Sequence, residues 1–190
     1  EVSKIRKVKP SDLLNRDVIN LDNVRIMGVL RGKCVLITGA GGTIGGELCR
    51  QALRYAPRKL IFLDNHSTSL FYIEQELRDA QSGAELIPVL GSIRDKELIE
   101  RLLVEHGPDL ILHAAAHKHV HQLETNIEEG VENNFLATYY LAAAAQRHRV
   151  GSFLLISTDK AVRPMGVMGA TKRAAESVVR HFAHSGSFRT

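Results

Sequence analysis

The sequence predicts an α/β fold, a doubly wound parallel sheet with helices on both faces. Three observations predict it: short apolar runs alternate with stretches of helical periodicity, the runs are apolar on both faces, and a glycine-rich turn joins the first run to a helix. Right-handed crossovers between the strands then give the strand order 3-2-1-4-5. A ligand is expected at the carboxyl ends of strands one and four, where the winding of the chain reverses.

The order of the elements follows from these patterns. Residues 1–31 lack a strong apolar period and are predicted to be a lead-in segment with at most a short helix, and residues 32–190 are predicted to form the domain. Five strands are expected at 33–38, 59–64, 85–90, 110–114 and 152–157. Helices are expected near 44–55, 67–80, 94–106, 127–147 and 168–184. The helix over 127–147 is apolar around much of its circumference, which favours burial against the sheet and leaves a homo-oligomer contact as the alternative.

Composition narrows the class of protein. With 190 residues and 44% hydrophobic content, the chain can bury one good core. No run approaches the roughly 18 apolar residues of a membrane span, and the N-terminus does not resemble a signal peptide. Cys34 and Cys49 lack C-x-x-C spacing, which suits reduced, buried thiols in a cytosolic compartment. The net charge of +4 is compatible with an anionic substrate, nucleic acid or an acidic membrane surface, but equally with a mildly basic solvated surface. No nucleic-acid partner is expected.

The glycine-rich turn predicts a site for a dinucleotide pyrophosphate. Three glycines with G-x-x-G-x-x-G spacing permit a tight turn, close approach of the backbone to a phosphate, and close packing of the helix on the strand. The helix that follows offers unpaired N–H groups and the positive end of its dipole to the anion. An ordinary strand-to-helix turn is the alternative, but the surrounding strands and helix favour the site. Its expected contacts are Gly39, Gly41, Gly42, Thr43, Ile44 and Gly45.

Asp64 ends the second strand, 19 residues after Gly45. At that distance a carboxylate can accept hydrogen bonds from the adenosine ribose hydroxyls, which favours NAD over NADP because no cationic side chain follows to pair with a 2′-phosphate. The alternative is that Asp64 caps the next helix.

Reactive side chains gather beyond strand five. The stretch Ser157–Lys160 supplies two hydroxyls, a carboxylate and an amine at the sheet edge. On the helix that follows, Met168 and Lys172 are four residues apart and therefore share one face. Each residue alone fits a turn, core or surface role, but their joint position at a strand's carboxyl end favours catalysis.

Five motifs extend this pattern: TGAGGTIGGELCRQ at 38–51, HAAAHKHV at 113–120, ENNFLAT at 132–138, ISTDKAV at 156–162 and MGATKR at 168–173. With them the chain resembles the extended short-chain dehydrogenase/reductases, and within these the nucleotide-sugar 4,6-dehydratases of bacterial polysaccharide biosynthesis. The resemblance implies a Rossmann-like fold and a lyase that removes water, with NAD, across C5 and C6 of UDP-N-acetylglucosamine. The product would be a 4-keto-6-deoxy sugar nucleotide.

The resemblance also implies roles for the reactive residues. Asp159 would be the acid at C6, Lys160 the base at C5, and Lys172 the partner of the nicotinamide ribose. At the position of Met168 the family usually has the tyrosine that acts as the base for C4. Its large membrane-anchored members have a methionine there, as this chain does. Asp159, or water relayed through Ser157 or Thr158, could serve instead. For Asp159 to act as an acid, burial and loss of water would have to raise a carboxyl pKa that the neighbouring amine lowers.

Further contacts are implied in the same way. Cofactor contacts are expected at Ser92, Ile93, Ala114, Ala115 and Ala116, and substrate contacts at Lys118, His119, Glu124 and Asn134. Helix capping and solvent exposure are the alternatives for Glu124. The histidines at 113, 117, 119 and 121 suggest zinc, but they lack a cysteine to complete a tetrahedral set and are expected to line the cofactor cleft, with no metal.

The chain is expected to be a fragment that lacks the family's C-terminal substrate region. Its basic first residues resemble a stretch that follows a membrane-anchored region, so the domain would be cytoplasmic at a bacterial inner membrane. A non-catalytic NAD-binding module and a nucleotide-sugar 4-epimerase remain as alternatives, the epimerase normally requiring the tyrosine that Met168 replaces.

Overall fold

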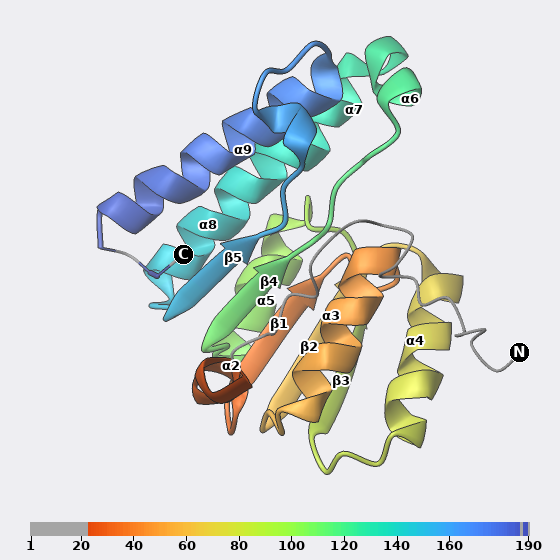
Figure 1. Ribbon diagram of the computed structural model, residues 1–190, viewed down its shortest axis with the longest axis vertical. Coiled ribbons are helices and arrows are strands. Elements are labelled where there is room, and N and C mark those ends of the chain that lie inside the picture. Colours follow the sequence, from red (N-terminus) through yellow and green to blue (C-terminus); the bar gives the residue numbers. More distant parts are fainter. Residues whose placement is uncertain (1–22, 187, 190) are drawn as a thin grey trace, which may run out of the picture.

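The computed structural model describes residues 23–186 and 188–189, and its centre is a five-stranded parallel sheet (Figure 1). The strands are β1 (Cys34–Thr38), β2 (Lys59–Asp64), β3 (Glu85–Leu90), β4 (Leu110–His113) and β5 (Ser152–Leu155). All neighbouring pairs are parallel, and the order is β3-β2-β1-β4-β5. The predicted strand order is therefore confirmed.

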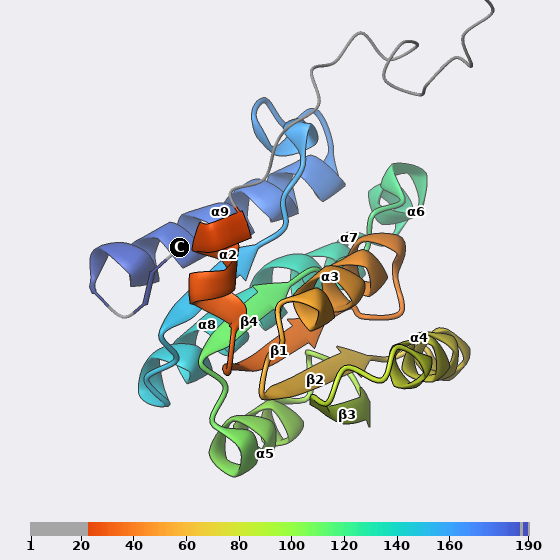
Figure 2. The same cartoon turned by 60° about the horizontal axis from the view of Figure 1, so that its bottom comes forward.

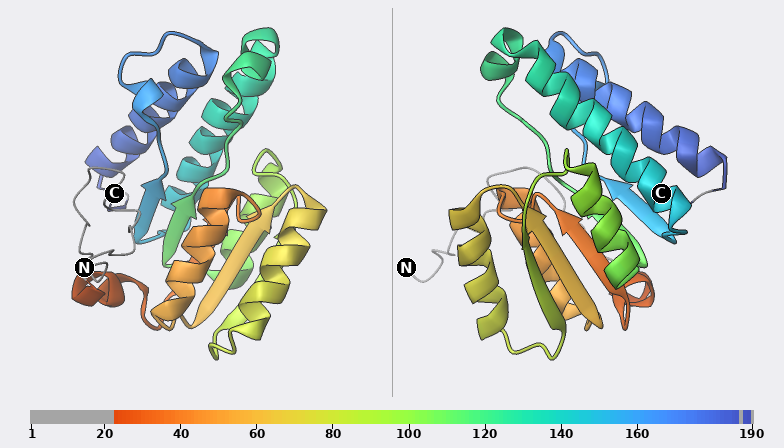
Figure 3. Two further views of the ribbon diagram at one scale, coloured as in Figure 1. Left: turned by 45° about the vertical axis from the view of Figure 1, so that its right-hand side comes forward. Right: turned by 180° about the vertical axis from the view of Figure 1, so that it is seen from behind.

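Helices cover both faces of the sheet, as Figure 3 shows. On one face, α3 (Thr43–Arg54) and α4 (Ser67–Asp79) pack with the short α2 (Asn23–Leu30), which leads directly into β1 (Figure 2). On the other face lie α5 (Lys96–His106), α8 (Ala137–Arg147) and α9 (Val167–His184). Every residue of β1 is buried because it is the central strand, and its side chains alternate between the two hydrophobic clusters.

The segment before β1 and the two cysteines agree with the sequence where the structure describes them. Residues 1–22 lie outside the described residues, and the short helix expected before Gly32 is present as α2. Leu30 of α2 packs in the core, and the division into lead-in and domain stays a prediction. Cys34 and Cys49 are buried free thiols, as expected. Within 23–186 and 188–189, no helix is both long enough and apolar enough to cross a membrane.

The helix predicted over 127–147 is wrong as a single α-helix. Two short helices, α6 (Val120–Thr125) and α7 (Ile127–Gly130), precede a π-helical segment, η1 (Val131–Leu136), which continues into α8. Asn126 separates α6 from α7 in a non-helical conformation (φ −131°, ψ 61°). The wider turn of η1 accommodates two consecutive buried amides, Asn133 and Asn134, and a 3.6-residue hydrophobic period carries no signal for such a turn.

Strand five is shorter than predicted, and its shortening forms the reactive turn. The strand ends at Leu155, and a 3₁₀ turn, η2 (Asp159–Ala161), follows Thr158. Because this turn breaks the alternation of side chains along an extended strand, Asp159 and Lys160 need not point to opposite faces. The backbone therefore bends just past Thr158.

Candidate functional site

A cleft of about 540 Å³ lies at the carboxyl ends of the central strands. Its floor is the turn between β1 and α3, and its walls are the segments that follow β2, β3 and β4 together with α6 and α7. Thr38 and His113, the last residues of β1 and β4, are paired in the sheet, so the cleft opens where the winding reverses. This is the predicted ligand position.

Close approach of backbone to backbone builds the turn after β1. Gly39 has a φ of +70°, and a Cβ there would lie 2.6 Å from the Ala115 nitrogen. A Cβ at Gly45 would lie 1.9 Å from the Gly39 carbonyl oxygen. Gly42 donates its N–H to that same oxygen over 3.1 Å. Only glycines fit at 39 and 45, which holds the start of α3 tightly against the end of β1.

The N-terminus of α3 faces the cleft without a side-chain cap. Gly42 is the N-cap residue and has no side chain that could accept a hydrogen bond from the first turn. Thr43, Ile44 and Gly45 line the cleft at this helix end. Helix N–H groups in the first turn lack intrahelical partners, and the helix dipole adds partial positive charge. This turn therefore fits a phosphate, as the glycine spacing predicts.

Asp64 lines the cleft from the end of β2, but part of its hydrogen-bonding capacity serves the turn. One carboxylate oxygen accepts the Gly41 N–H over 2.8 Å, and the other accepts the His66 N–H over 2.8 Å. The alternative that Asp64 caps α4 is wrong, because His66 is the N-cap residue and its ring nitrogen accepts from Ser69. Carboxylate oxygens accept more than one hydrogen bond, so Asp64 can still take a ribose hydroxyl.

Most of the predicted cofactor contacts line this cleft. Besides the turn and Asp64, these are Ser92, Ile93, Ala114, Ala115 and Ala116. Two predicted contacts lie elsewhere. Gly41 packs under α4, where a Cβ would lie 2.6 Å from the Ser69 Cβ, and Lys172 lies behind the end of β5. Gly41 therefore positions Asp64 through its N–H and is not part of the cleft wall.

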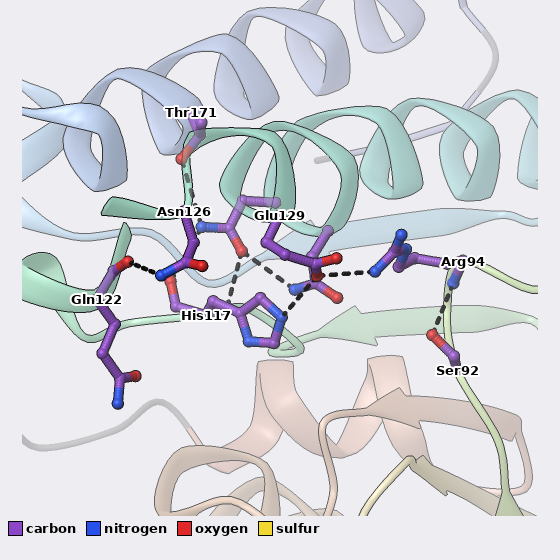
Figure 4. Close-up of polar contacts among 9 residues, drawn as sticks. Ser92, Arg94, His117, Gln122, Asn126, Glu129 and Thr171 are labelled. Carbon is purple, nitrogen blue, oxygen red and sulfur yellow. Dashed lines mark hydrogen bonds and ion pairs between the residues drawn. The ribbon is translucent and has the colours of Figure 1, made fainter. Parts of the chain in front are cut away.

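The upper wall of the cleft is a polar network that the sequence analysis missed (Figure 4). Arg94 donates to Glu129 over 2.8 Å, and His117 Nε2 lies 3.9 Å from the same carboxylate oxygen. The pair joins the segment after β3 to α7. The cleft residues left out of the prediction are Leu63, Asn65, Gly91, Gln122, Leu123, Asn126, Glu129 and Asn133. Those on α6, α7 and η1 had no sequence signal, because no element was predicted over α6, and α7 and η1 were predicted as part of one long helix.

The four predicted substrate contacts divide into two pairs. Lys118 and His119 line the cleft. Glu124 does not, because its Oε1 accepts the Val167 N–H over 2.8 Å at the start of α9, so the capping alternative is correct. Asn134 is buried, and its side-chain amide bonds to both backbone groups of His117. It supports the cleft wall from behind and does not itself line the cleft.

The histidine cluster does not form a metal site among the described residues. His117 and His119 line the cleft, as expected, but His113 and His121 do not. His113 is completely buried, with one threonine hydroxyl at each ring nitrogen. The expectation that it lines the cleft is wrong because it points inward from the end of β4, whereas its neighbours in the following segment face the cavity.

The turn beyond β5 brings its ionisable side chains together at the surface. Asp159 Oδ1 lies 3.7 Å from Lys160 Nζ, and the Asp159 side chain is 88% exposed. A hydrogen bond from the Thr158 hydroxyl and then the Lys160 charge lower the pKa of the Asp159 carboxyl. The burial that an acid at this position requires is not present in this chain. Ser157 donates its hydroxyl to Glu176 of α9, so neither hydroxyl is free as a relay here.

Met168 and Lys172 share the buried face of α9, as their spacing predicts. Lys172 Nζ donates to the Ile156 carbonyl oxygen over 2.6 Å at the end of β5. Burial lowers the pKa of Lys172 to about 8, although the Glu176 charge opposes the shift. The amine therefore still carries its proton for the most part near neutral pH but releases it more easily than an exposed lysine. Met168, on the same face of α9, has no proton to exchange.

The parallel sheet, the glycine turn and the uncapped helix end define a class: a dinucleotide-binding α/β domain of the extended short-chain dehydrogenase/reductase type. Within that class the chain belongs to the family described as "Polysaccharide biosynthesis protein", which matches residues 35–189.

The chain is also similar to three known proteins. It is 44% identical, over 95% of its length, to "Capsular polysaccharide biosynthesis protein CapD" of Staphylococcus aureus and covers 30% of that protein. It is 30% identical, over 79% of its length, to "UDP-N-acetylglucosamine 4,6-dehydratase (inverting)" of Campylobacter jejuni and covers 43% of it. A third similar protein is the dTDP-glucose 4,6-dehydratase DesIV of Streptomyces venezuelae, whose double mutant has a crystal structure with NAD and DAU bound. The match includes 81% of this chain and 52% of the DesIV chain, with a TM-score of 0.69 and 25% sequence identity. The chain thus spans less than half of the two curated relatives.

Proposed function

We propose that this chain is the NAD-binding part of a nucleotide-sugar 4,6-dehydratase that acts on UDP-N-acetylglucosamine in surface polysaccharide biosynthesis. The observation that carries the proposal is the position of the reactive turn. Asp159 and Lys160 follow β5, the strand beside β4, at the same sheet edge as the cleft. In doubly wound folds the carboxyl ends of neighbouring strands bring a bound cofactor and such groups together.

The cleft residues support NAD as the cofactor. The glycine turn and the N-terminus of α3 fit a pyrophosphate, and the Asp64 carboxylate at the cleft wall fits unmodified ribose hydroxyls better than a 2′-phosphate. The DesIV structure was determined with NAD bound, which supports the same choice. When bound, NAD would take a hydride from C4 of the sugar and return one to C6.

We assign the two proton transfers of the dehydration step to Asp159 and Lys160. The C4 ketone makes the C5 proton acidic, so Lys160 removes it and Asp159 protonates the departing C6 hydroxyl. Asp159 needs a raised pKa for this, which bound sugar would supply by excluding water from a carboxyl that is now solvated. Lys172 holds a buried amine on the Ile156 carbonyl behind the end of β5, and its proposed role is to bind the nicotinamide ribose.

The test is incubation of the longer protein that contains this chain with UDP-N-acetylglucosamine and NAD, followed by mass spectrometry of the nucleotide sugar. Loss of one water from the sugar is expected. Asp159→Asn and Lys160→Ala should each abolish the loss, while Asp79→Asn, which removes an exposed carboxylate at the end of α4, should leave it unchanged. Intact conversion in both turn variants would refute the catalytic assignment.

A non-catalytic NAD-binding module is the second candidate, favoured by one observation. Met168 is buried at the position of the usual base and cannot accept a proton. NAD binding without any change in the sugar nucleotide would support this candidate. A product of unchanged mass with inverted C4 would indicate a 4-epimerase, for which the same methionine is unfavourable.

We also propose that the longer protein holds this domain on the cytoplasmic side of a bacterial inner membrane. Support comes from the basic run Lys4, Arg6, Lys7 and Lys9, opposed in the first nine residues by Glu1 alone. Cell fractionation with protease protection tests it, and cleavage of this domain from the periplasmic side would contradict it.

A further inference from the structure

A continuous chain of hydrogen bonds runs through the core from the end of β1 to α9. Thr38 Oγ1 lies 2.6 Å from His113 Nδ1, and His113 Nε2 lies 2.9 Å from Thr138 Oγ1. Thr138 Oγ1 donates to the Asn134 carbonyl oxygen over 2.8 Å. All four residues are at least 99% buried, so no bulk water can replace a missing partner.

The chain continues from Asn134 into α9. The Asn134 side-chain amide donates to Thr171 Oγ1 over 3.3 Å, and the Thr171 hydroxyl donates to the Met168 carbonyl oxygen over 2.9 Å. Figure 4 shows Thr171 above the amide that also holds His117. The relay, defined as Thr38, His113, Thr138, Asn134 and Thr171, therefore connects a cleft strand to the helix that carries Met168 and Lys172.

The partners of the two threonines decide which nitrogen of His113 carries the proton. Thr138 has one hydroxyl proton, and it goes to the Asn134 carbonyl, so Thr138 can only accept from His113. His113 therefore carries its proton on Nε2, and Nδ1 accepts from Thr38. Thr38 then accepts the Ala115 N–H over 3.4 Å. The opposite tautomer would set two acceptors against each other between Thr138 and Asn134.

The surroundings keep this ring neutral. Complete burial, and then the charge of Lys172, lower the pKa of His113 to about 3. The ring also packs edge-on against Phe153 of β5, with centroids 6.0 Å apart. No acidic side chain is a partner of His113 in the contacts of the described residues.

One end of the relay lies against the glycine turn. Thr38 directly precedes Gly39, and Ala115, whose N–H bonds to Thr38, lies where any Cβ at Gly39 would collide. A change in the length or direction of the Thr38–His113 contact would therefore move the two segments between which the cleft opens.

We propose that His113, fixed as the neutral Nε2–H tautomer, is a positioning residue that sets the spacing between the glycine turn of the cleft and the helix carrying Met168 and Lys172. The inference depends on the proposed function only for the identity of the cofactor. His113 itself touches neither the cleft nor the reactive turn.

The first experiment measures the imidazole nitrogens of His113 by NMR in the ¹⁵N-labelled 190-residue chain. We expect a proton on Nε2, an unprotonated Nδ1, and signals that do not change between pH 8 and pH 5. A proton on Nδ1, or titration near the ordinary pKa of about 6.5, would overturn the proposal. This readout needs neither cofactor nor sugar.

The second experiment uses two substitutions at Thr138. Thr138→Ser keeps the hydroxyl, whereas Thr138→Val keeps the shape but leaves His113 Nε2 without its partner and removes the hydroxyl bond to the Asn134 carbonyl. Calorimetry should show NAD binding weakened about tenfold by valine and unchanged by serine, the ratio expected when one buried hydrogen bond is lost. Ile99→Val, which removes a core methyl group in α5, controls for loss of stability. Equal affinity for the valine and serine variants, or an equal loss in Ile99→Val, would overturn the proposal.

A third readout does not require the cofactor to bind. In Thr38→Val, the ¹³C-methyl signal of Met168 should shift, while that of the fully exposed Met165 should not. An unmoved Met168 signal would show that the relay does not couple the two ends. If the unaltered chain binds no NAD, the proposed function fails, whereas the tautomer and this signal still decide the relay.

Discussion

Replacing Gly45 or its neighbour Gly46 by alanine distinguishes an effect on the glycine turn from an effect on the stability of α3. Both glycines are buried in the first turns of α3, and alanine is intrinsically better than glycine in a helix by about 1 kcal/mol. At Gly46 the nearest atom to a new Cβ is the Ala40 carbonyl oxygen at 3.4 Å, an ordinary contact. We therefore expect Gly46→Ala to keep or raise the free energy of unfolding by up to about 1 kcal/mol.

At Gly45 the same methyl group would collide with backbone. Its Cβ would lie 1.9 Å from the Gly39 carbonyl oxygen, about 1.6 Å inside a favourable non-bonded contact of about 3.5 Å. Overpacking costs about 1–3 kcal/mol, and no rotamer can relieve it because the neighbour is main chain. After the helix gain is subtracted, we expect Gly45→Ala to lose about 2 kcal/mol of unfolding free energy.

The turn must also widen, which moves the start of α3 away from Gly39 and should weaken the proposed phosphate site. Urea unfolding and calorimetric titration with NAD measure both effects, with Gly46→Ala as the matched control. We expect at least about tenfold weaker NAD binding in Gly45→Ala alone. If the two variants unfold at the same urea concentration and bind NAD equally, the assignment of this turn is refuted.

Two further predictions concern α9. The free energy of unfolding should rise by roughly 3 kcal/mol between pH 8 and pH 10.5, because the unfolded chain retains the Lys172 proton up to its ordinary pKa of 10.5 whereas the buried amine loses it near about 8. Lys172→Met should lack this rise in urea unfolding measured across that range, and an identical slope would disprove the burial effect. Glu124→Ala should lower the unfolding free energy by about 1 kcal/mol through loss of the cap at Val167, and Glu124→Gln, which keeps an acceptor oxygen, by less. Equal stability of the alanine variant and the unaltered chain would contradict the capping role.

The half of the cleft proposed to bind the cofactor was predictable because local sequence determines its geometry. Gly39, Gly42 and Gly45 lie within one short segment, and their spacing alone requires a turn that only glycine can make. The position of Asp64 was predictable as well, because it ends β2, the next strand in the chain, which pairs with the strand before the turn. Strand order followed from the alternation of elements and the handedness of crossovers, which exclude nearly all other arrangements.

The other half of the site was less predictable because its residues are defined by what packs around them. Glu124 and Asn134 have residue types suited to a polar ligand, yet one caps α9 and the other is hydrogen-bonded to the segment behind the cleft. Glu129 and His117 in the cleft wall, and Arg94 that pairs with Glu129, come from three segments that are separate in the chain. A π-helical segment places Asn133 at the cleft, and its bonding pattern leaves no trace in hydrophobic periodicity.

By itself the sequence determined the parallel sheet, the turn that can hold a pyrophosphate, and the pairing of Met168 with Lys172 on one helical face, because each depends on spacing along a single segment or on a general rule of handedness. Only the tertiary structure decided which polar groups face the cleft and which face the core. His113 shows the reason: a histidine at the end of β4 is suited equally to a ligand or to a buried relay, and the hydroxyls of Thr38 and Thr138, distant in sequence, make it the relay.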